Sequence, residues 1–381
     1  MGKGKAFFAV MAAMLASSIL TIVGICVALG MDGDKAANLA RLLGAMRFIE
    51  MRYVNDVDDT ALIDGAISGM VQSLGDPHSI YLDEAMYHQL KDHTEGSFGG
   101  IGVYMGFKDG GVQVVSVMPG TPGEKAGLQA NDAILAVDGT PVTEFQPEEV
   151  ALHIRGAVGT EVELLIRREG QEDTTYRITR DTIQIHTVSG KMLENGIGYI
   201  RIVSFSEKTG QEFQTVYDEL AGQGMKGLIL DLRENPGGLI TSCIEVCRML
   251  IPKGTIVSVI ERNGSEEIYQ SDLEAPKYPV VALIDGNSAS ASEILAGALQ
   301  DTGAGTLVGT KSYGKGSVQM VLPMAHEDGL KLTIAKYYTP SGRSIDGTGI
   351  EPDVTVELPQ DRASDTQLAK AVEIMEEKLR N

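Results

Sequence analysis

The sequence is poor in positive charge. Its 381 residues include 32 Lys and Arg against 52 Asp and Glu, giving a net charge of −20. Nucleic acids and anionic membrane surfaces bind clusters of basic side chains, so this balance argues against either as the ligand. The length predicts two or three domains rather than one, and an apolar content of 43% is enough for a core in each.

Cysteine is also scarce, with three in the chain. Cys26 lies in an apolar N-terminal stretch, and Cys243 and Cys247 are spaced to share one face of a predicted helix. A disulfide between them would distort that helix, so we expect two buried thiols. The sequence contains no CxxC pair and no cluster of His and Cys, so no metal site is predicted.

Charge is absent from residues 6–30, which follow two lysines within residues 1–5 and precede Asp32 and Asp34. About 20 apolar residues cross a bilayer as a helix. Positive charge before the run and negative charge after it place the N-terminus in the cytoplasm. We therefore expect a single-pass anchor in the cell membrane with the rest of the chain outside. A cleaved signal peptide is the alternative.

The hydrophobic pattern then changes along the chain. Helical spacing predicts a helical module over residues 31–95, and short strands between Gly- and Pro-rich turns predict a β-rich domain over 96–181. Strands alternating with helices predict an α/β core over 182–360, followed by a C-terminal helix over 361–381 that is a candidate for oligomer contacts. The expected core strands include 198–202, 227–231 and 280–284, and the expected helices are 208–221, 239–250 and 290–299.

One strand-to-helix junction in the core contains Pro236, Gly237 and Gly238. Free backbone N–H groups at the start of a helix bind anions, and an oxyanion hole requires such donors. An ordinary tight turn fits these residues equally well.

A second junction places Ser290 immediately before an apolar helix. With Glu293 it fits a capping box, in which the serine is only a helix cap. A serine at this position is also exposed to the positive end of the helix, and the amide of Ala291 can point toward a developing oxyanion. Both interpretations use the same geometry.

A serine nucleophile requires a base. The core offers His186 and His326, neither of which lies in a recognisable motif. Lys315 is flanked by glycines in an otherwise apolar run, and burial can lower a lysine pKa from about 10.4 by about three units. Gln319, four residues on, is placed to orient the lysine or the serine. A surface lysine in a turn is the alternative.

Three segments together resemble the carboxyl-terminal processing proteases, also called tail-specific proteases. They are DLRENPGG at 231–238, NSASASE at 287–293 and YGKGSVQ at 313–319, in that order. The resemblance covers nearly everything after the expected anchor. It implies a multidomain α/β protein with a helical N-terminal module, a β-rich PDZ domain and a mixed α/β protease core similar to the crotonase-like fold. It implies no metal and no cofactor.

The resemblance also implies roles for single residues. Ser290 corresponds to the nucleophile, and its spacing to the lysine favours it over Ser288 and Ser292. Lys315 corresponds to the general base and Gln319 to the third catalytic residue. The oxyanion donors implied are the amides of Gly237 and Ala291, with Gly238 as a neighbouring alternative.

The segment Phe98–Val103 is similar to the PDZ loop that binds a C-terminal carboxylate through backbone N–H groups. Asn131 stands where this family often has Gly. Arg155 is a candidate contact through which the PDZ domain gates the active site. The expected substrates are C-terminal tails of exported or membrane-associated proteins, and a homodimer and an activating partner protein stay open. The residues expected to bind the tail are Gly100, Ile101, Gly102 and Val103 of the loop, together with Arg155.

Two other functions compete with this hypothesis. A catalytically inactive PDZ scaffold would have no need for Ser290, Lys315 and Gln319 together. An acyl-thioester enzyme can use paired Gly amides in a related core, but its coenzyme A substrates are cytoplasmic, whereas this chain carries an export signal.

Overall fold

The computed structural model describes residues 32–108, 111–145, 147–359 and 364–380, together with Met11, Met14 and Ser17. The described chain divides into a unit that ends at Tyr81 and a larger unit that begins at Leu82. Strand β1 (Ile80–Leu82) contains this boundary.

The first unit contains the helices α2 (Gly33–Arg52) and α3 (Asp59–Gln72). Each begins after an aspartate whose carboxylate accepts a backbone N–H of the first turn, Asp32 from Lys35 and Asp58 from Thr60. The predicted helical N-terminal region is therefore confirmed. Among the described residues, no helix is both long and apolar enough to span a membrane. The anchor predicted at 6–30 lies outside the described residues except for the three single positions named above.

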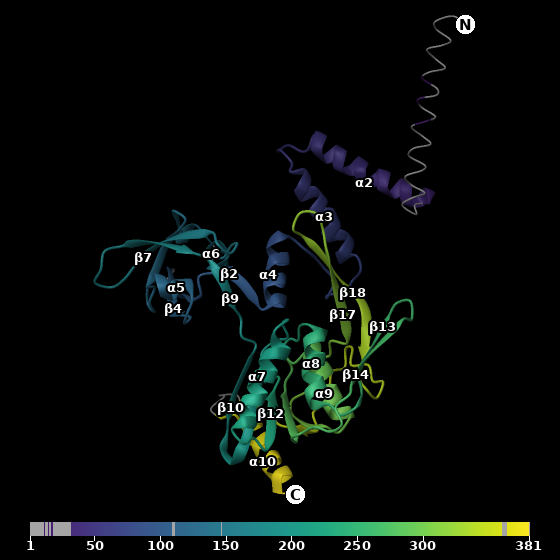
Figure 1. Cartoon of the computed structure of the whole chain (residues 1–381). Helices are drawn as coiled ribbons and strands as arrows, with labels where there is room; N and C mark the ends of the chain where they lie inside the picture. Colours follow the sequence, from purple (N-terminus) through teal and green to yellow (C-terminus); the bar gives the residue numbers. More distant parts are fainter. Residues whose placement is uncertain are drawn as a thin grey trace, which may run out of the picture. The chain divides into compact units, whose positions relative to one another are not determined.

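A β-rich domain forms the N-terminal part of the larger unit (Figure 1). Its strands lie in the antiparallel order β3-β4-β5-β7-β8, and the short β6 pairs with β5. In β7 the buried residues alternate, with Val162, Leu164 and Ile166 at most 1% exposed, because successive side chains face opposite sides of a sheet. Entry and exit strands β2 (Ser97–Gly100) and β9 (Asp181–Gln184) pair antiparallel. The other elements are β3 (Val103–Lys108), β4 (Gly111–Val117), α5 (Pro122–Ala126), β5 (Ala133–Val137), β6 (Thr140–Pro141), η1 (Val142–Glu144), α6 (Pro147–Ile154), β7 (Glu161–Arg167) and β8 (Thr174–Thr179).

A buried ion pair in this domain makes its stability depend on pH. Asp132 is 1% exposed, and its carboxylate accepts hydrogen bonds from the Arg168 guanidinium at 2.7 Å and from the Gln129 amide at 2.8 Å. Burial acts to raise the pKa of Asp132, but these hydrogen bonds outweigh it and hold the pKa below its usual value. A carboxyl group with a lowered folded-state pKa stabilises the fold above its unfolded pKa of about 3.9, and this stabilisation disappears as the pH falls through the folded-state value.

We therefore expect Asp132→Asn to destabilise the protein by about 2–3 kcal/mol at pH 7, because Arg168 loses its partner in a buried site. Thermal or denaturant unfolding should show a constant difference from wild type between pH 7 and about 5, which begins to shrink near pH 4 and is lost as the pH falls through the lowered pKa of Asp132. Asp173→Asn, in the exposed Arg167–Asp173 pair, is the matched control and should change stability little. A difference that does not shrink at all as the pH falls below about 4 would contradict the prediction.

The core is built on a sheet with the strand order β10-β11-β12-β15-β16-β19, in which β10 is antiparallel and the others are parallel. Both faces of its central strands are covered, so β12 and β15 are buried along their whole length. The strands are β10 (Val188–Met192), β11 (Ile197–Ile202), β12 (Gly227–Asp231), β15 (Val280–Ile284), β16 (Gly305–Gly309) and β19 (Val354–Thr355), and η2 (Glu194–Gly196) precedes β11.

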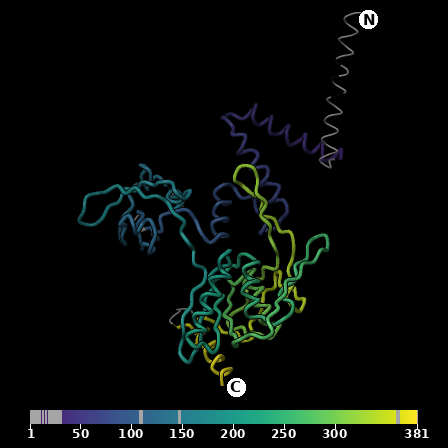
Figure 2. Tube along the Cα trace, in the orientation of Figure 1, coloured from purple at the N-terminus to yellow at the C-terminus, as the bar shows by residue number. Residues whose placement is uncertain are grey.

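Helices α7 (Thr209–Gly222), α8 (Ile240–Leu250) and α9 (Ala291–Asp301) cover one face of this sheet. Helix α10 (Thr366–Arg380) covers the other face, where Ala371 and Met375 pack against Ile229 and Val281. Figure 2 shows this yellow C-terminal helix beside the strands of the core. The apolar side of the C-terminal helix, which we considered for oligomer contacts, is thus occupied by the chain's own sheet.

A second sheet of the core joins β17 (Ser317–Pro323), β18 (Gly329–Tyr338), β13 (Gly254–Glu261) and β14 (Glu266–Ser271) through antiparallel pairs. The sequence pattern did not predict these strands, since few of their residues are fully buried and they show no regular alternation. The hairpin β17–β18 carries residues of the candidate site.

Candidate active site

The two strand-to-helix junctions meet because β12 and β15 are neighbouring parallel strands. The carboxyl ends of adjacent parallel strands lie at one edge of the sheet, and loops at this edge form ligand sites. Direct hydrogen bonds join the loops, since the Ala289 amide donates to the Asn235 carbonyl at 3.0 Å and the Glu234 amide to the Asp285 carboxylate at 3.0 Å.

The structure separates the serines of the second junction. Ser288 and Ser292 are fully buried, and their hydroxyls donate to the carbonyl oxygens of Leu232 at 2.9 Å and Asn235 at 3.0 Å. Both therefore tie the two loops together. Ser290 instead lines a pocket of about 380 Å³. Its φ of 53° is the left-handed region that non-glycine residues rarely adopt, and such strain is common at functional sites.

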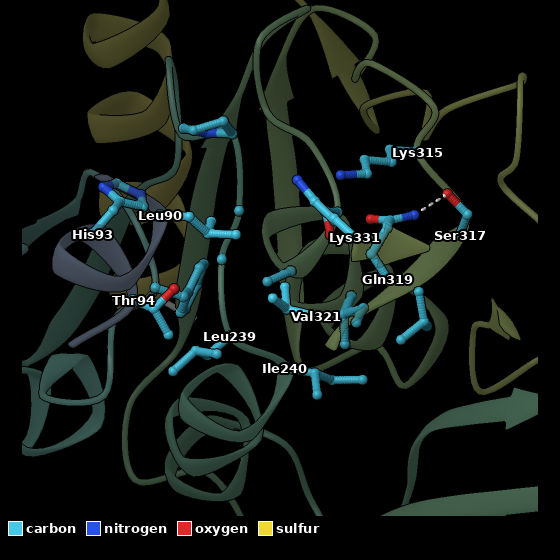
Figure 3. Close-up of a pocket in the computed structure, with 18 of the residues that line it drawn as sticks. Leu90, His93, Thr94, Leu239, Ile240, Lys315, Ser317, Gln319, Val321 and Lys331 are labelled. Atoms are coloured by element: carbon cyan, nitrogen blue, oxygen red, sulfur yellow. Dashed lines mark hydrogen bonds between the residues drawn. The ribbon is translucent and has the colours of Figure 1, made fainter. Parts of the chain in front are cut away.

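Lys315 and Gln319 line the same pocket. The Gln319 amide nitrogen donates to the hydroxyls of Ser317 at 2.9 Å and Thr333 at 3.2 Å. Figure 3 shows Lys315 and Gln319 on one side of the pocket, and Leu90, His93 and Thr94 of helix α4 (Glu84–Glu95) on the other.

Glu293 connects the nucleophile candidate to the lysine segment. It is fully buried, and within the described residues its carboxylate oxygens accept four hydrogen bonds. The donors are the amides of Ser290 at 2.8 Å, Gly314 at 2.7 Å and Lys315 at 2.9 Å, and the Ser312 hydroxyl at 2.5 Å. The sequence suggested only a helix-capping role for Glu293, and no sequence signal pointed to its contacts with residues 312–315.

Tyr337 of β18 supports the same two segments. Its hydroxyl lies 2.5 Å from the Lys315 carbonyl oxygen and 3.1 Å from that of Ser290. Burial, reinforced by the nearby Glu293, raises the pKa of Tyr337 well above its usual range, so the hydroxyl keeps its proton and donates it. Sequence analysis did not identify this residue, because nothing in its local pattern distinguishes it from other strand aromatics.

The predicted oxyanion donors differ in availability. The Gly237 amide donates to the side-chain oxygen of Asn235 at 2.8 Å, so it is already occupied. The amides of Gly238 and Ala291 line the pocket and have no acceptor within the part of the chain that is described. Both glycines are still required, because an added Cβ would lie 2.8 Å from the Ser290 Cβ at Gly237 and 2.1 Å from the Phe205 carbonyl oxygen at Gly238.

Among the described residues, no histidine is hydrogen-bonded to Ser290. His186 lies 2.8 Å from the Glu212 carboxylate on α7. His93 lines the pocket but makes no hydrogen bond to Ser290 within the described chain. The sequence analysis did not consider His93, since it lies outside the core in sequence.

The loop expected to bind substrate tails begins at the end of β2. The amides of Ile101 and Gly102 have no acceptor among the described residues, and Gly102 has a φ of 73°. The Arg155 guanidinium lies 3.4 Å from the Asp92 carboxylate of α4 and 4.1 Å from the centroid of the Phe98 ring.

One group of side chains in the described segments could hold a metal ion, namely Glu84, His88 and Glu327, whose ligand atoms lie within 4.8 Å of one another. All three are exposed, and none lines the pocket that contains Ser290.

Comparison with known proteins identifies the family. Residues 196–356 match Peptidase family S41, residues 113–168 match a PDZ domain, and residues 4–86 match the N-terminal domain of the activating protease CtpB. A carboxy-terminal-processing protease of Bartonella bacilliformis is 38% identical over 364 residues, which cover 93% of this chain and 83% of that protein. The chain belongs to the carboxy-terminal processing proteases.

Other members of this family support the assignment. The carboxy-terminal processing protease CtpA of Bacillus subtilis is 39% identical over 361 residues, covering 93% of this chain and 78% of that protein. A solved photosystem II D1 C-terminal processing protease is 30% identical, with a TM-score of 0.51, and the match covers 88% of this chain and 96% of that one. The predicted family, PDZ domain and α/β protease core are confirmed, and the chain is a serine-type peptidase.

Proposed function

We propose that this processing protease uses Ser290 as nucleophile, Lys315 as general base and Gln319 as the residue that orients the lysine. The observation that supports this most is that all three line one pocket, together with the unoccupied amides of Gly238 and Ala291. The alternative of an inactive scaffold is not favoured, because none of these groups is missing.

In the proposed reaction, the neutral Lys315 amine removes the proton of the Ser290 hydroxyl as the oxygen attacks the substrate carbonyl carbon. The resulting ammonium gives this proton to the leaving amine as the peptide C–N bond breaks, which leaves an acyl-enzyme. Lys315 then removes a proton from a water molecule that attacks the ester, and the proton returns to the Ser290 oxygen as the acid product leaves.

We propose Gly238 and Ala291, rather than Gly237, as the donors to the oxyanion. A donor that already serves an internal acceptor must break that bond before it can bind the oxyanion, whereas a preorganised free donor does not. Gly237 is then a spacing residue: its lack of a side chain permits the close approach to Ser290 and Ala291.

Gln319 is suited to orient Lys315 because its amide group is fixed at one end. The nitrogen donates to Ser317 and Thr333, which leaves the carbonyl oxygen directed away from them and into the pocket (Figure 3). An oxygen there accepts a hydrogen bond from the lysine in both of its protonation states.

For the substrate, we propose protein tails whose terminal carboxylate is bound by the loop Gly100–Val103. The free amides of Ile101 and Gly102 support this role. Arg155 then acts as a gating contact, because it pairs with Asp92 of helix α4. The same helix contributes Leu90 and His93 to the pocket.

We further propose the domain boundaries given above and a membrane anchor at 6–30 that places the catalytic core outside the cell membrane. The flanking charges support the anchor. Release of the full chain from membranes by carbonate would contradict it.

A homodimer and an activating partner stay predictions. Light scattering of the full chain tests the homodimer, and activity with and without cell extract tests the activating partner.

The experiment that tests the proposed function is labelling of the full-length protein with a serine-reactive phosphonate, followed by peptide mapping, beside cleavage of an unfolded protein. We expect modification at Ser290 alone, and loss of both labelling and cleavage in Ser290→Ala. Ser265→Ala, on an exposed turn, should behave as wild type. Labelling at Ser288 or Ser292, or cleavage that survives in Ser290→Ala, would refute the assignment.

A further inference from the structure

A second lysine shares the pocket with Lys315. Lys331 of β18 lines it together with Ser290 and Gln319, although it lies outside the three segments that resemble the family. Figure 3 shows Lys315 and Lys331 extending into the same pocket.

The register of the hairpin explains this position. Lys331 is paired with Val321, and Thr333 with Gln319, so all four side chains lie on one face of the β17–β18 ladder. Residues two apart on a strand are separated by about 7 Å. Lys331 therefore lies one strand repeat beyond Gln319, which corresponds to about two residues of an extended substrate.

The charge of Lys331 has no acidic partner among the described residues. Its side chain is half-buried, and within the described residues it makes neither an ion pair nor a hydrogen bond. Lysines of this chain that do pair include Lys336, whose ammonium is 3.0 Å from the Asp346 carboxylate. No Asp or Glu lines the pocket, although the chain has an excess of acidic residues.

The remaining walls of the pocket are largely apolar, and they include Leu90, Leu239, Ile240, Ile294 and Val318. A ligand that fits must therefore combine apolar side chains with one negative group. The end of a protein chain with apolar residues has this chemistry, because its α-carboxylate is the one charge that every tail carries.

We propose that Lys331 binds a carboxylate of the substrate within the catalytic pocket, and so selects where the tail is cut. This inference rests on the proposed function of Ser290 and Lys315. Lys331 is a specificity residue: it contacts the substrate and takes no part in proton transfer. The carboxylate is either an acidic side chain or a chain terminus that is not at that moment bound by the loop Gly100–Val103.

The test uses the full-length protein and one peptide with an apolar tail in three versions: the free acid, the C-terminal amide, and an amide whose last residue is Asp. The kcat/KM of each is measured for wild type, for Lys331→Met, which keeps the aliphatic stem, and for Lys226→Met, an exposed lysine outside the pocket. The acid-to-amide ratio is compared between variants, so any preference that arises at the PDZ loop is present in all of them and cancels.

We expect Lys331→Met to reduce the acid-to-amide ratio by about 10-fold or more, which is the effect of losing one charge-assisted hydrogen bond. Lys226→Met should leave it unchanged. Cleavage of the Asp amide as fast as the free acid assigns the site to carboxylates in general, and slower cleavage assigns it to the chain terminus. If the acid-to-amide ratio is unchanged in Lys331→Met and the variant has normal thermal stability, the role of Lys331 is wrong but the proposed function of Ser290 and Lys315 stands. If the wild-type protein cleaves none of the three peptides and is not labelled at Ser290, the proposed function is wrong as well.

Discussion

Lys315→Met is expected to lower kcat by about 10³-fold or more, because Ser290 then loses its proposed general base. Methionine keeps most of the side-chain volume, so the fold should be retained. The Tyr337 hydroxyl and the Glu293 carboxylate hold the main chain of Lys315 and do not depend on its ammonium group. The measurement is single-turnover cleavage of an unfolded protein by the purified full-length variants.

The double variant Ser290→Ala/Lys315→Met gives the stricter test. Residues that act in one proton transfer are not additive, so the double variant should be no slower than Ser290→Ala. Lys226→Met is the control for loss of one positive charge. A further large decrease in the double variant would show that Lys315 acts independently of Ser290, and the Ser/Lys mechanism would be wrong.

Glu293→Gln is expected to lower both stability and turnover. Each carboxylate oxygen of Glu293 accepts from two donors, so replacing one oxygen with an NH₂ group leaves two buried donors facing another donor. The cost should be about 3 kcal/mol in the free energy of unfolding. The bonds lost are those of Ser290 and Lys315 or those of Ser312 and Gly314, depending on which oxygen position carries the NH₂ group. Either loss loosens the contact between the serine and lysine segments, so kcat should fall by about 10²-fold.

Denaturant unfolding and steady-state kinetics separate these effects. A positioning role predicts a fall in kcat with little change in KM, together with slower phosphonate labelling of Ser290. Glu219→Gln, on the exposed side of α7, is the matched control and should change neither quantity. A Glu293→Gln variant that is less stable but has the wild-type kcat would restrict Glu293 to capping helix α9.

The secondary structure around the site was largely predictable. The expected strands at 227–231 and 280–284 match β12 and β15, and helix α8 begins one residue after the predicted start. These elements are buried, and continuous apolar runs between turn residues identify them. The strands β17 and β18 were not predicted, because their half-exposed residues carry no comparable periodicity.

The sequence by itself determined the chemical groups of the site. Three local patterns carry these groups: a serine at a helix start with an acidic residue three positions later, a glycine pair after a strand, and a lysine between glycines. Each pattern reflects a requirement of the backbone within a few residues, so it is visible in the sequence. The order of the three segments then identified the family, which the comparisons confirm.

Only the tertiary structure decided how these groups are used. The parallel pairing of β12 and β15 buries Ser288 and Ser292 against the first loop and leaves Ser290 in the pocket. The Asn235 side chain, two residues earlier, occupies the Gly237 amide, whereas the Gly238 amide has no acceptor among the described residues. Lys331 enters the pocket through the hairpin register. The separation of the serines depends on contacts between residues far apart in the chain, and no local pattern encodes such contacts.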